Sequence, residues 1–74
     1  MLHINMNNSI LTSIRIKRAE YLRSTRIESN ITKSDLSRKS GLSRKCIDRI
    51  ESGIKPWNVD SELIYIETLN KSSL

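Results

Sequence analysis

The longest regular pattern of apolar and polar residues runs through positions 10–28. This stretch contains neither glycine nor proline, and apolar residues recur in it at three- and four-residue spacing. That spacing predicts one long amphipathic helix, whose buried stripe we place near Leu22. Asn30 follows two residues after this stretch and suits the left-handed turn that ends a helix.

Residues 1–9 have a different pattern, because Leu2, Ile4 and Met6 alternate with polar residues. Such alternation is typical of a short strand. Two interpretations are open: a loosely held N-terminal tail, or a strand that pairs with its copy in a dimer. In both, this segment precedes a single folded domain over residues 10–74.

Two short helices are predicted next, on either side of Gly41. Thr32 precedes an acidic residue, Asp35, by three positions, which is a capping-box pattern and predicts a helix up to the residue before Gly41. Gly41 can adopt the left-handed conformation that ends this helix. Ser43 is then placed to cap a second helix over residues 44–52.

Four apolar residues decide how these two helices meet. Leu36 is expected to face inward from the first helix, and Ile47 and Ile50 share one face of the second. Leu42 fills the turn between them. A tight turn at Gly41 lets the helices cross at a steep angle over this small apolar seam. The spacing therefore indicates a helix-turn-helix unit.

A fourth helix completes the predicted fold. Gly53 is placed to end the preceding helix, and Asn58 can cap a last helix over about residues 59–69. The sequence thus predicts a small all-α domain of about four helices, with a short N-terminal strand as an addition that the pattern leaves open.

The last helix is apolar on more than one face. We expect Leu63, Ile66 and Leu69 on its buried face, because they recur at three-residue spacing. Ile64 and Tyr65 complete the apolar run and would then face outward. An exposed apolar patch of this kind is a candidate interface with another protein chain.

Net charge and composition narrow the classes of function. The chain carries a formal charge of +5, which indicates an anionic partner, with nucleic acid ahead of a membrane. One cysteine and one distant histidine form neither a disulfide nor a zinc site, and we expect no cofactor. No apolar run approaches the roughly 20 residues of a membrane span. Residues 1–14 lack the pattern of a signal peptide, so we expect a cytoplasmic protein. The sequence has no paired nucleophile and base, so we expect that the protein is not an enzyme.

Residues 32–53, TKSDLSRKSGLSRKCIDRIESG, resemble the Cro/CI-type (XRE) helix-turn-helix family of DNA-binding regulators. The resemblance extends over about residues 13–70 and implies a lambda-repressor-like fold. It also implies an ion pair between Arg26 and Glu51, which we expect to be architectural. The residues that carry the resemblance are Thr32, Leu36, Ser37, Gly41, Leu42, Ser43, Ile47, Ile50, Glu51 and Gly53.

The resemblance also implies where DNA would bind. In this family the second helix of the unit lies in the major groove, and the positions that contact base edges fall on Arg44, Lys45 and Arg49. Arginine and lysine bind guanine most often, so we expect a G-containing half-site. The expected phosphate contacts are Thr32, Lys33, Arg38, Lys39, Ser43 and Lys55. The alternative is that these cations form an ordinary solvated face.

Members of this family usually bind a palindrome as a two-fold dimer. We therefore expect a homodimer on double-stranded operator DNA, joined through Ile64 and Tyr65 or through Leu2 and Ile4. The expected role is a repressor or autoregulator of a phage or mobile element, located at the nucleoid. The alternative is a protein-interaction module, such as an antirepressor or antitoxin, that masks a protein partner through Trp57 and the last helix.

Overall fold

The computed structural model describes the backbone of residues 4–53 and 58–72 and the side chains of residues 10–53 and 58–72. The described chain forms four helices and no strand, which confirms the all-α prediction. None of these helices is long and apolar enough to cross a membrane. The helices are α1 (Ile4–Glu28), α2 (Lys33–Ser40), α3 (Arg44–Ser52) and α4 (Val59–Ser72).

The N-terminal segment does not form the predicted strand. Residues 4–9 are the first turns of α1, so the strand interpretation is wrong for Ile4, and Leu2 lies outside the described residues. No glycine or proline stands between residues 4 and 28. A helix that has formed its first turn adds each further residue at little cost, so alternation over three apolar positions does not stop it.

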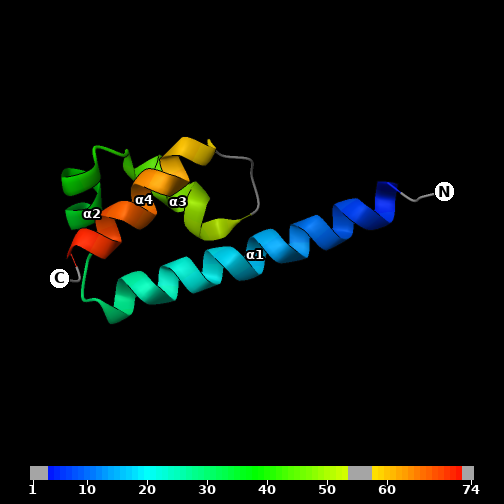
Figure 1. Ribbon diagram of the computed structural model, residues 1–74, viewed down its shortest axis with the longest axis horizontal. Coiled ribbons are helices and arrows are strands. Elements are labelled where there is room, and N and C mark those ends of the chain that lie inside the picture. Colours follow the sequence, from blue (N-terminus) through cyan, green and yellow to red (C-terminus); the bar gives the residue numbers. More distant parts are fainter. Residues whose placement is uncertain (1–3, 54–57, 73–74) are drawn as a thin grey trace.

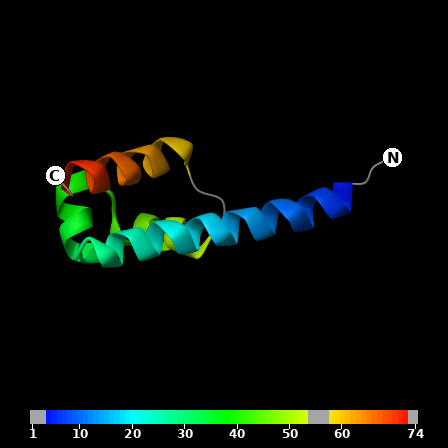
Figure 2. The same cartoon turned by 60° about the horizontal axis from the view of Figure 1, so that its bottom comes forward.

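Helix α1 runs along the length of the molecule, and the other three helices pack over its C-terminal half (Figures 1 and 2). The molecule is therefore elongated, with principal extents of 46, 21 and 15 Å. The N-terminal half of α1 extends beyond the compact part in both views.

The caps and turns predicted around Gly41 are present. The Thr32 hydroxyl accepts a hydrogen bond from the Asp35 amide at 3.0 Å, and the Ser43 hydroxyl accepts one from the Cys46 amide at 3.1 Å. Gly41 has a φ of 82°, the left-handed region that a residue with a Cβ atom avoids. These local interactions set the bounds of α2 and the start of α3, as their sequence predicts.

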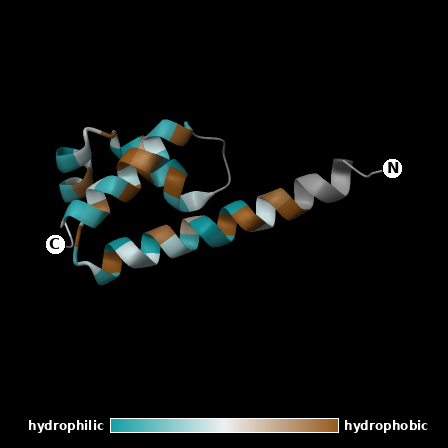
Figure 3. Cartoon of the chain, in the orientation of Figure 1, coloured by the Kyte–Doolittle hydropathy of each residue, from teal (hydrophilic) through white to brown (hydrophobic). Residues whose placement is uncertain are grey.

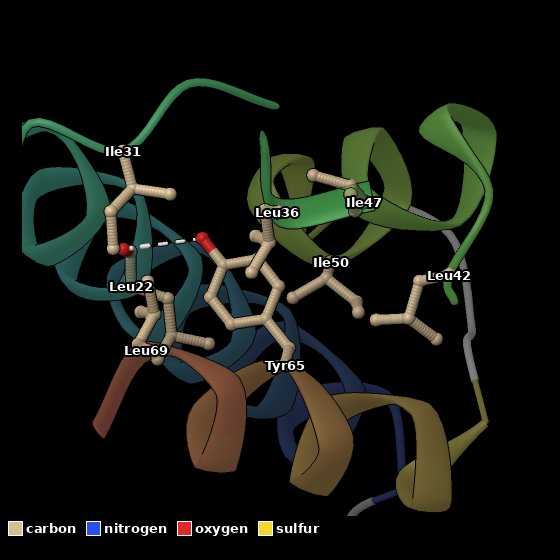
Figure 4. Close-up of a cluster of buried hydrophobic side chains, with 8 residues drawn as sticks. All are labelled: Leu22, Ile31, Leu36, Leu42, Ile47, Ile50, Tyr65 and Leu69. Carbon is tan, nitrogen blue, oxygen red and sulfur yellow. Dashed lines mark hydrogen bonds between the residues drawn. The ribbon is translucent and has the colours of Figure 1, made fainter. Parts of the chain in front are cut away.

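A single apolar core joins the four helices (Figure 4). Leu36, Ile47 and Ile50 are fully buried, as the spacing predicts. Leu42 closes the core at the turn between α2 and α3. The members of the core are Leu22, Ile31, Leu36, Leu42, Ile47, Ile50, Tyr65 and Leu69.

Two predictions for α4 are wrong. Tyr65, expected at a dimer interface, has an exposed fraction of 0% and lies in the centre of the core. Leu63, expected in the core, is 57% exposed. The inward face of α4 carries Glu62, Tyr65 and Leu69 instead. In an unbroken apolar run, hydrophobicity alone does not choose the buried face, and the hydrogen bonds of the tyrosine hydroxyl decide it here.

A buried polar network links α1, α3 and α4. The Arg26 guanidinium donates to both carboxylate oxygens of Glu51, at 2.6 and 3.1 Å, as the resemblance implied. It also donates to the Ile31 carbonyl at 2.9 Å. The Tyr65 hydroxyl donates to Glu51 Oε2 at 2.6 Å. The hydrogen bond from Arg26 to Glu51 raises the pKa of Arg26, despite the opposing effect of burial.

Replacing Tyr65 with phenylalanine is expected to lower the free energy of unfolding by about 2 kcal/mol at neutral pH, because a hydrogen bond to a charged group is lost. A second effect appears in alkaline solution. Burial, followed by the hydrogen bond to Glu51, raises the pKa of Tyr65 above its ordinary value of 10.0. The folded state thus keeps a proton that the unfolded chain releases, so this stabilisation is present below pH 10 and is lost as the pH rises above it.

Urea unfolding of the wild-type chain and Tyr65→Phe at pH 7 and pH 11 checks both effects. The stability difference between the two chains should shrink at the higher pH. An unchanged difference would show that folding does not raise the pKa of the Tyr65 hydroxyl.

Candidate nucleic-acid interface

Helix α3 presents one apolar face to the core and one charged face to solvent. Ile47 and Ile50 point inward, whereas Arg44, Lys45 and Arg49 are exposed. Ser43 caps the first turn of α3, and the two cations of that turn, Arg44 and Lys45, are exposed. The structure therefore places the three predicted base-contacting residues on one outward surface.

An acidic residue that the sequence reasoning missed lies among these cations. Asp48 is four positions after Arg44, about 40° away around a helix with 3.6 residues per turn. We call Arg44, Lys45, Asp48 and Arg49 the α3 face. Counting helical positions along the predicted helix would have located Asp48, because its spacing from Arg44 places both on the same side.

Lys33 forms an ion pair with Asp48. The lysine ammonium lies 2.7 Å from Asp48 Oδ1, which joins the first residue of α2 to the middle of α3. The hydrogen bond from Lys33 lowers the pKa of the Asp48 carboxyl below its ordinary value. Lys33, predicted to bind a phosphate, is thus held by a protein carboxylate in this structure.

Arg44 is also oriented by α2. Its guanidinium donates to the Ser34 hydroxyl at 3.0 Å, across the turn between the helices. Among the described residues, no hydrogen bond or ion pair holds the side chains of Lys45 and Arg49. On the α3 face, a hydrogen bond thus orients the Arg44 side chain, whereas the side chains of Lys45 and Arg49 can reorient when a ligand binds.

The turn between α2 and α3 is held by side-chain hydrogen bonds. The Ser37 hydroxyl donates to the Leu42 carbonyl at 2.6 Å, and the Ser40 hydroxyl accepts from the Leu42 amide at 3.0 Å. Both bonds satisfy backbone groups that no helix pairs. They connect α2 to the turn that precedes α3, so the protein's own hydrogen bonds hold the two helices together at the turn.

The predicted phosphate contacts divide into two groups. Thr32, Lys33 and Ser43 lie at the starts of α2 and α3, next to the α3 face. The hydroxyls of Thr32 and Ser43 cap these helices, and helix N-termini attract anions. The start of α2 is joined to the α3 face by the ion pair between Lys33 and Asp48 and by the hydrogen bond from Arg44 to Ser34.

The second group consists of Arg38, Lys39 and Lys55, for which the structure shows no contact with the α3 face among the described residues. Arg38 pairs with Asp35 at 2.7 Å, and this hydrogen bond lowers the pKa of the aspartate. Lys39, at the other end of α2, lines a groove against α4. Lys55 lies outside the described residues, as does Trp57.

Helix α4 carries acidic residues, Asp60 and Glu62, in its first turn. Glu62 of α4 is buried and pairs with Arg18 of α1 at 2.7 Å. No three His, Cys, Asp or Glu side chains gather into a metal site within the part of the chain that the structure describes. The α3 face is therefore the candidate site that the following proposal uses.

Comparisons of the chain with protein-family models, with curated proteins and with solved structures find no match. A functional proposal therefore depends on the arrangement of residues described above.

Proposed function

We propose that the chain is a sequence-specific DNA-binding regulator of the Cro/CI type, which binds a palindromic operator as a homodimer through α3. The observation that carries this proposal is the α3 face, where three cations stand on a short, capped helix whose other side is anchored in the core. A helix presented in this way fits the major groove, which is wide enough to admit it.

Each side chain of the α3 face has a suitable partner on a base edge. Arg44 and Lys45 can donate to guanine O6 and N7, and Arg49 lies one turn further along the helix. Asp48 can accept a hydrogen bond from the cytosine amino group. The expected half-site therefore contains G·C base pairs.

The backbone of the operator would be held next to this face. Ser43, Thr32 and the amides at the starts of α2 and α3 are suited to phosphate oxygens. Lys33 joins them when it exchanges its carboxylate partner for a phosphate. These contacts position the domain and carry no sequence information.

Selection of bound sequences from a random duplex pool at about 150 mM salt tests the proposal, because non-specific binding is weak at that concentration. An enriched palindrome with a fixed half-site spacing supports a dimeric sequence-specific regulator. No enrichment, with binding that disappears as salt is added, contradicts it. In that case a masking module for a protein partner becomes the stronger candidate.

Replacing Arg44 with alanine is expected to weaken binding to the selected operator by about 1–3 kcal/mol and to relax its sequence at one position per half-site. The matched control is Lys71→Ala, which removes one positive charge at the far end of α4. It should change affinity little and leave the preferred sequence unaltered. Fluorescence anisotropy with the operator and a scrambled duplex measures both variants, and equal losses on the two duplexes would argue against base contact by Arg44.

A further inference from the structure

Two consecutive residues at the start of α2 hold two residues of α3. The Lys33 ammonium lies 2.7 Å from Asp48 Oδ1. The next residue, Ser34, accepts a hydrogen bond from the Arg44 guanidinium at 3.0 Å. Hydrophilic residues predominate in α2 (Figure 3), and Leu36 is its buried residue. Polar contacts thus join the first turn of α2 to the α3 face.

These two contacts differ in what they leave for a ligand. Arg44 gives one of its N–H groups to a neutral hydroxyl, so it keeps its full charge and further donors for a base edge. Lys33 is paired with a carboxylate of opposite charge. While this pair is intact, the carboxylate compensates the ammonium, which then attracts a phosphate less strongly. The structure therefore restrains Lys33 more than Arg44.

The ion pair is weak enough to be exchanged. The side chains of Lys33 and Asp48 are 35% and 54% exposed, so water screens their attraction. Asp48 is ionised at neutral pH, since the hydrogen bond from Lys33 lowers the pKa of its carboxyl. An approaching ligand can therefore replace one member of the pair, but the other member then needs a new partner.

Within a complex with DNA, the Asp48 carboxylate needs a donor. An ionised carboxylate has acceptor atoms alone. The DNA around it carries negative phosphates, and the removal of water strengthens the repulsion between like charges. The loss of Lys33 as a partner therefore costs affinity unless the DNA itself supplies a donor to Asp48.

One base supplies such a donor without an acceptor beside it. In the major groove cytosine presents its N4 amino group. Guanine presents two acceptors, thymine an acceptor and a methyl group, and adenine a donor next to an acceptor. A cytosine that faces Asp48 can therefore replace Lys33 as the donor, whereas guanine and thymine leave the carboxylate without one.

We propose that Asp48 keeps Lys33 away from the DNA backbone until a cytosine faces Asp48. On other sequences the ion pair stays intact, and Lys33 makes no phosphate contact. On the operator the cytosine amino group donates to Asp48, and the released ammonium binds a phosphate. One correct base pair thus adds two contacts, so Asp48 widens the difference in affinity between the operator and other DNA. This inference rests on the proposed function, because it concerns how the α3 face distinguishes sequences.

A different arrangement of the same residues makes the opposite prediction. A lysine has three donors, so its ammonium could bridge Asp48 and a phosphate at the same time. In that arrangement Lys33 would contribute equally to binding every sequence. The two arrangements are therefore distinguished by whether the effect of Lys33 depends on the sequence of the duplex.

Fluorescence anisotropy at about 150 mM salt, with the selected operator and a scrambled duplex, measures this dependence. Lys33→Ala should weaken binding to the operator about fivefold, the contribution of one phosphate contact at this salt concentration. The same substitution should change binding to the scrambled duplex less than about twofold, because Lys33 does not contact phosphate there. Equal losses on the two duplexes overturn the proposal and favour the bridging arrangement.

Asp48→Asn tests the proposal with the opposite sign. Without the carboxylate Lys33 is released on every sequence, so the affinity for the scrambled duplex should rise about fivefold. Adding Lys33→Ala should remove this gain, and a gain that persists would come from lost repulsion alone and overturns the proposal. The matched control is Glu67→Gln, which changes the net charge equally and removes a carboxylate 3.9 Å from Lys71 on α4. It should leave the affinity for both duplexes within about twofold.

A purely structural role of the ion pair predicts another result. If the pair only held α2 against α3, Lys33→Ala and Asp48→Asn would each weaken binding to both duplexes, which overturns the proposal. Far-UV circular dichroism of each variant establishes that its helices are folded. A selected operator on which Lys33→Ala has no larger effect than on scrambled DNA contradicts this inference alone. A selection that enriches no sequence contradicts the proposed function, and this inference with it.

Discussion

Replacing Arg26 with methionine is expected to lower the free energy of unfolding by about 3–5 kcal/mol. The substitution keeps most of the side-chain volume, but of the side chains that donate to the buried Glu51 carboxylate it leaves the Tyr65 hydroxyl. It also removes the donor to the Ile31 carbonyl, which lies where the chain leaves α1 for α2. A domain of this length has about 4–11 kcal/mol of stability in total, so the variant should be close to unfolding.

A double substitution separates the cost of an unpaired charge from the value of the pair. Arg26→Met combined with Glu51→Leu removes both charges, and the double variant should be more stable than Arg26→Met alone. Urea unfolding followed by circular dichroism measures all three chains. A single variant within about 1 kcal/mol of the wild type would mean that Glu51 finds adequate solvation without the arginine.

Replacing Gly53 with alanine is the second substitution for which we expect a large effect, about 3–5 kcal/mol in the free energy of unfolding. Gly53 has a φ of 68°, and a Cβ atom added there would lie 2.6 Å from the Arg15 carbonyl oxygen and 3.0 Å from the Ile16 Cα. These are backbone atoms of α1, so the clash is relieved only if α1 moves away from α3. The left-handed conformation adds about 1–2 kcal/mol to this cost.

Gly41→Ala is the matched control for this prediction. Gly41 is also left-handed, with a φ of 82°, but a Cβ atom there would have nothing within 4 Å. The control should therefore show the conformational cost alone, about 1–2 kcal/mol. Equal losses of stability in Gly41→Ala and Gly53→Ala, measured by thermal or urea unfolding, would mean that the close approach of α1 to Gly53 contributes nothing.

Features that depend on neighbouring residues in the chain were predictable. Thr32 and Ser43 cap their helices, and Gly41 and Gly53 end theirs, because each acts on backbone groups within a few positions. The same is true of Asn58, whose side chain accepts from the Asp60 amide at 2.7 Å. Local hydrogen bonds thus set the helix bounds of α2 and α3 and the start of α4.

Features that depend on distant residues were harder to predict. The choice between Leu63 and Tyr65 for the core is made by Glu51 on another helix, to which the tyrosine hydroxyl donates. The hydrophobic pattern of α4 contains no information on that partner. The role of Asp48 was missed for a related reason, since its partner Lys33 is 15 positions away and belongs to α2. Spacing in the sequence does not reveal that Asp48 competes with a phosphate for Lys33, so Lys33 is predicted to bind phosphate alone.

The ion pair between Lys33 and Asp48 has a consequence for how strongly salt would weaken DNA binding. A phosphate that binds Lys33 must first displace a carboxylate, and the displaced Asp48 then attracts a cation from solution. That uptake offsets the cation which the phosphate releases to the solvent. The plot of log affinity against log salt concentration should therefore be about one unit less steep than the number of cation–phosphate contacts implies. DNA binding would then release fewer cations in total. The affinity for DNA would therefore fall less steeply as the ionic strength rises.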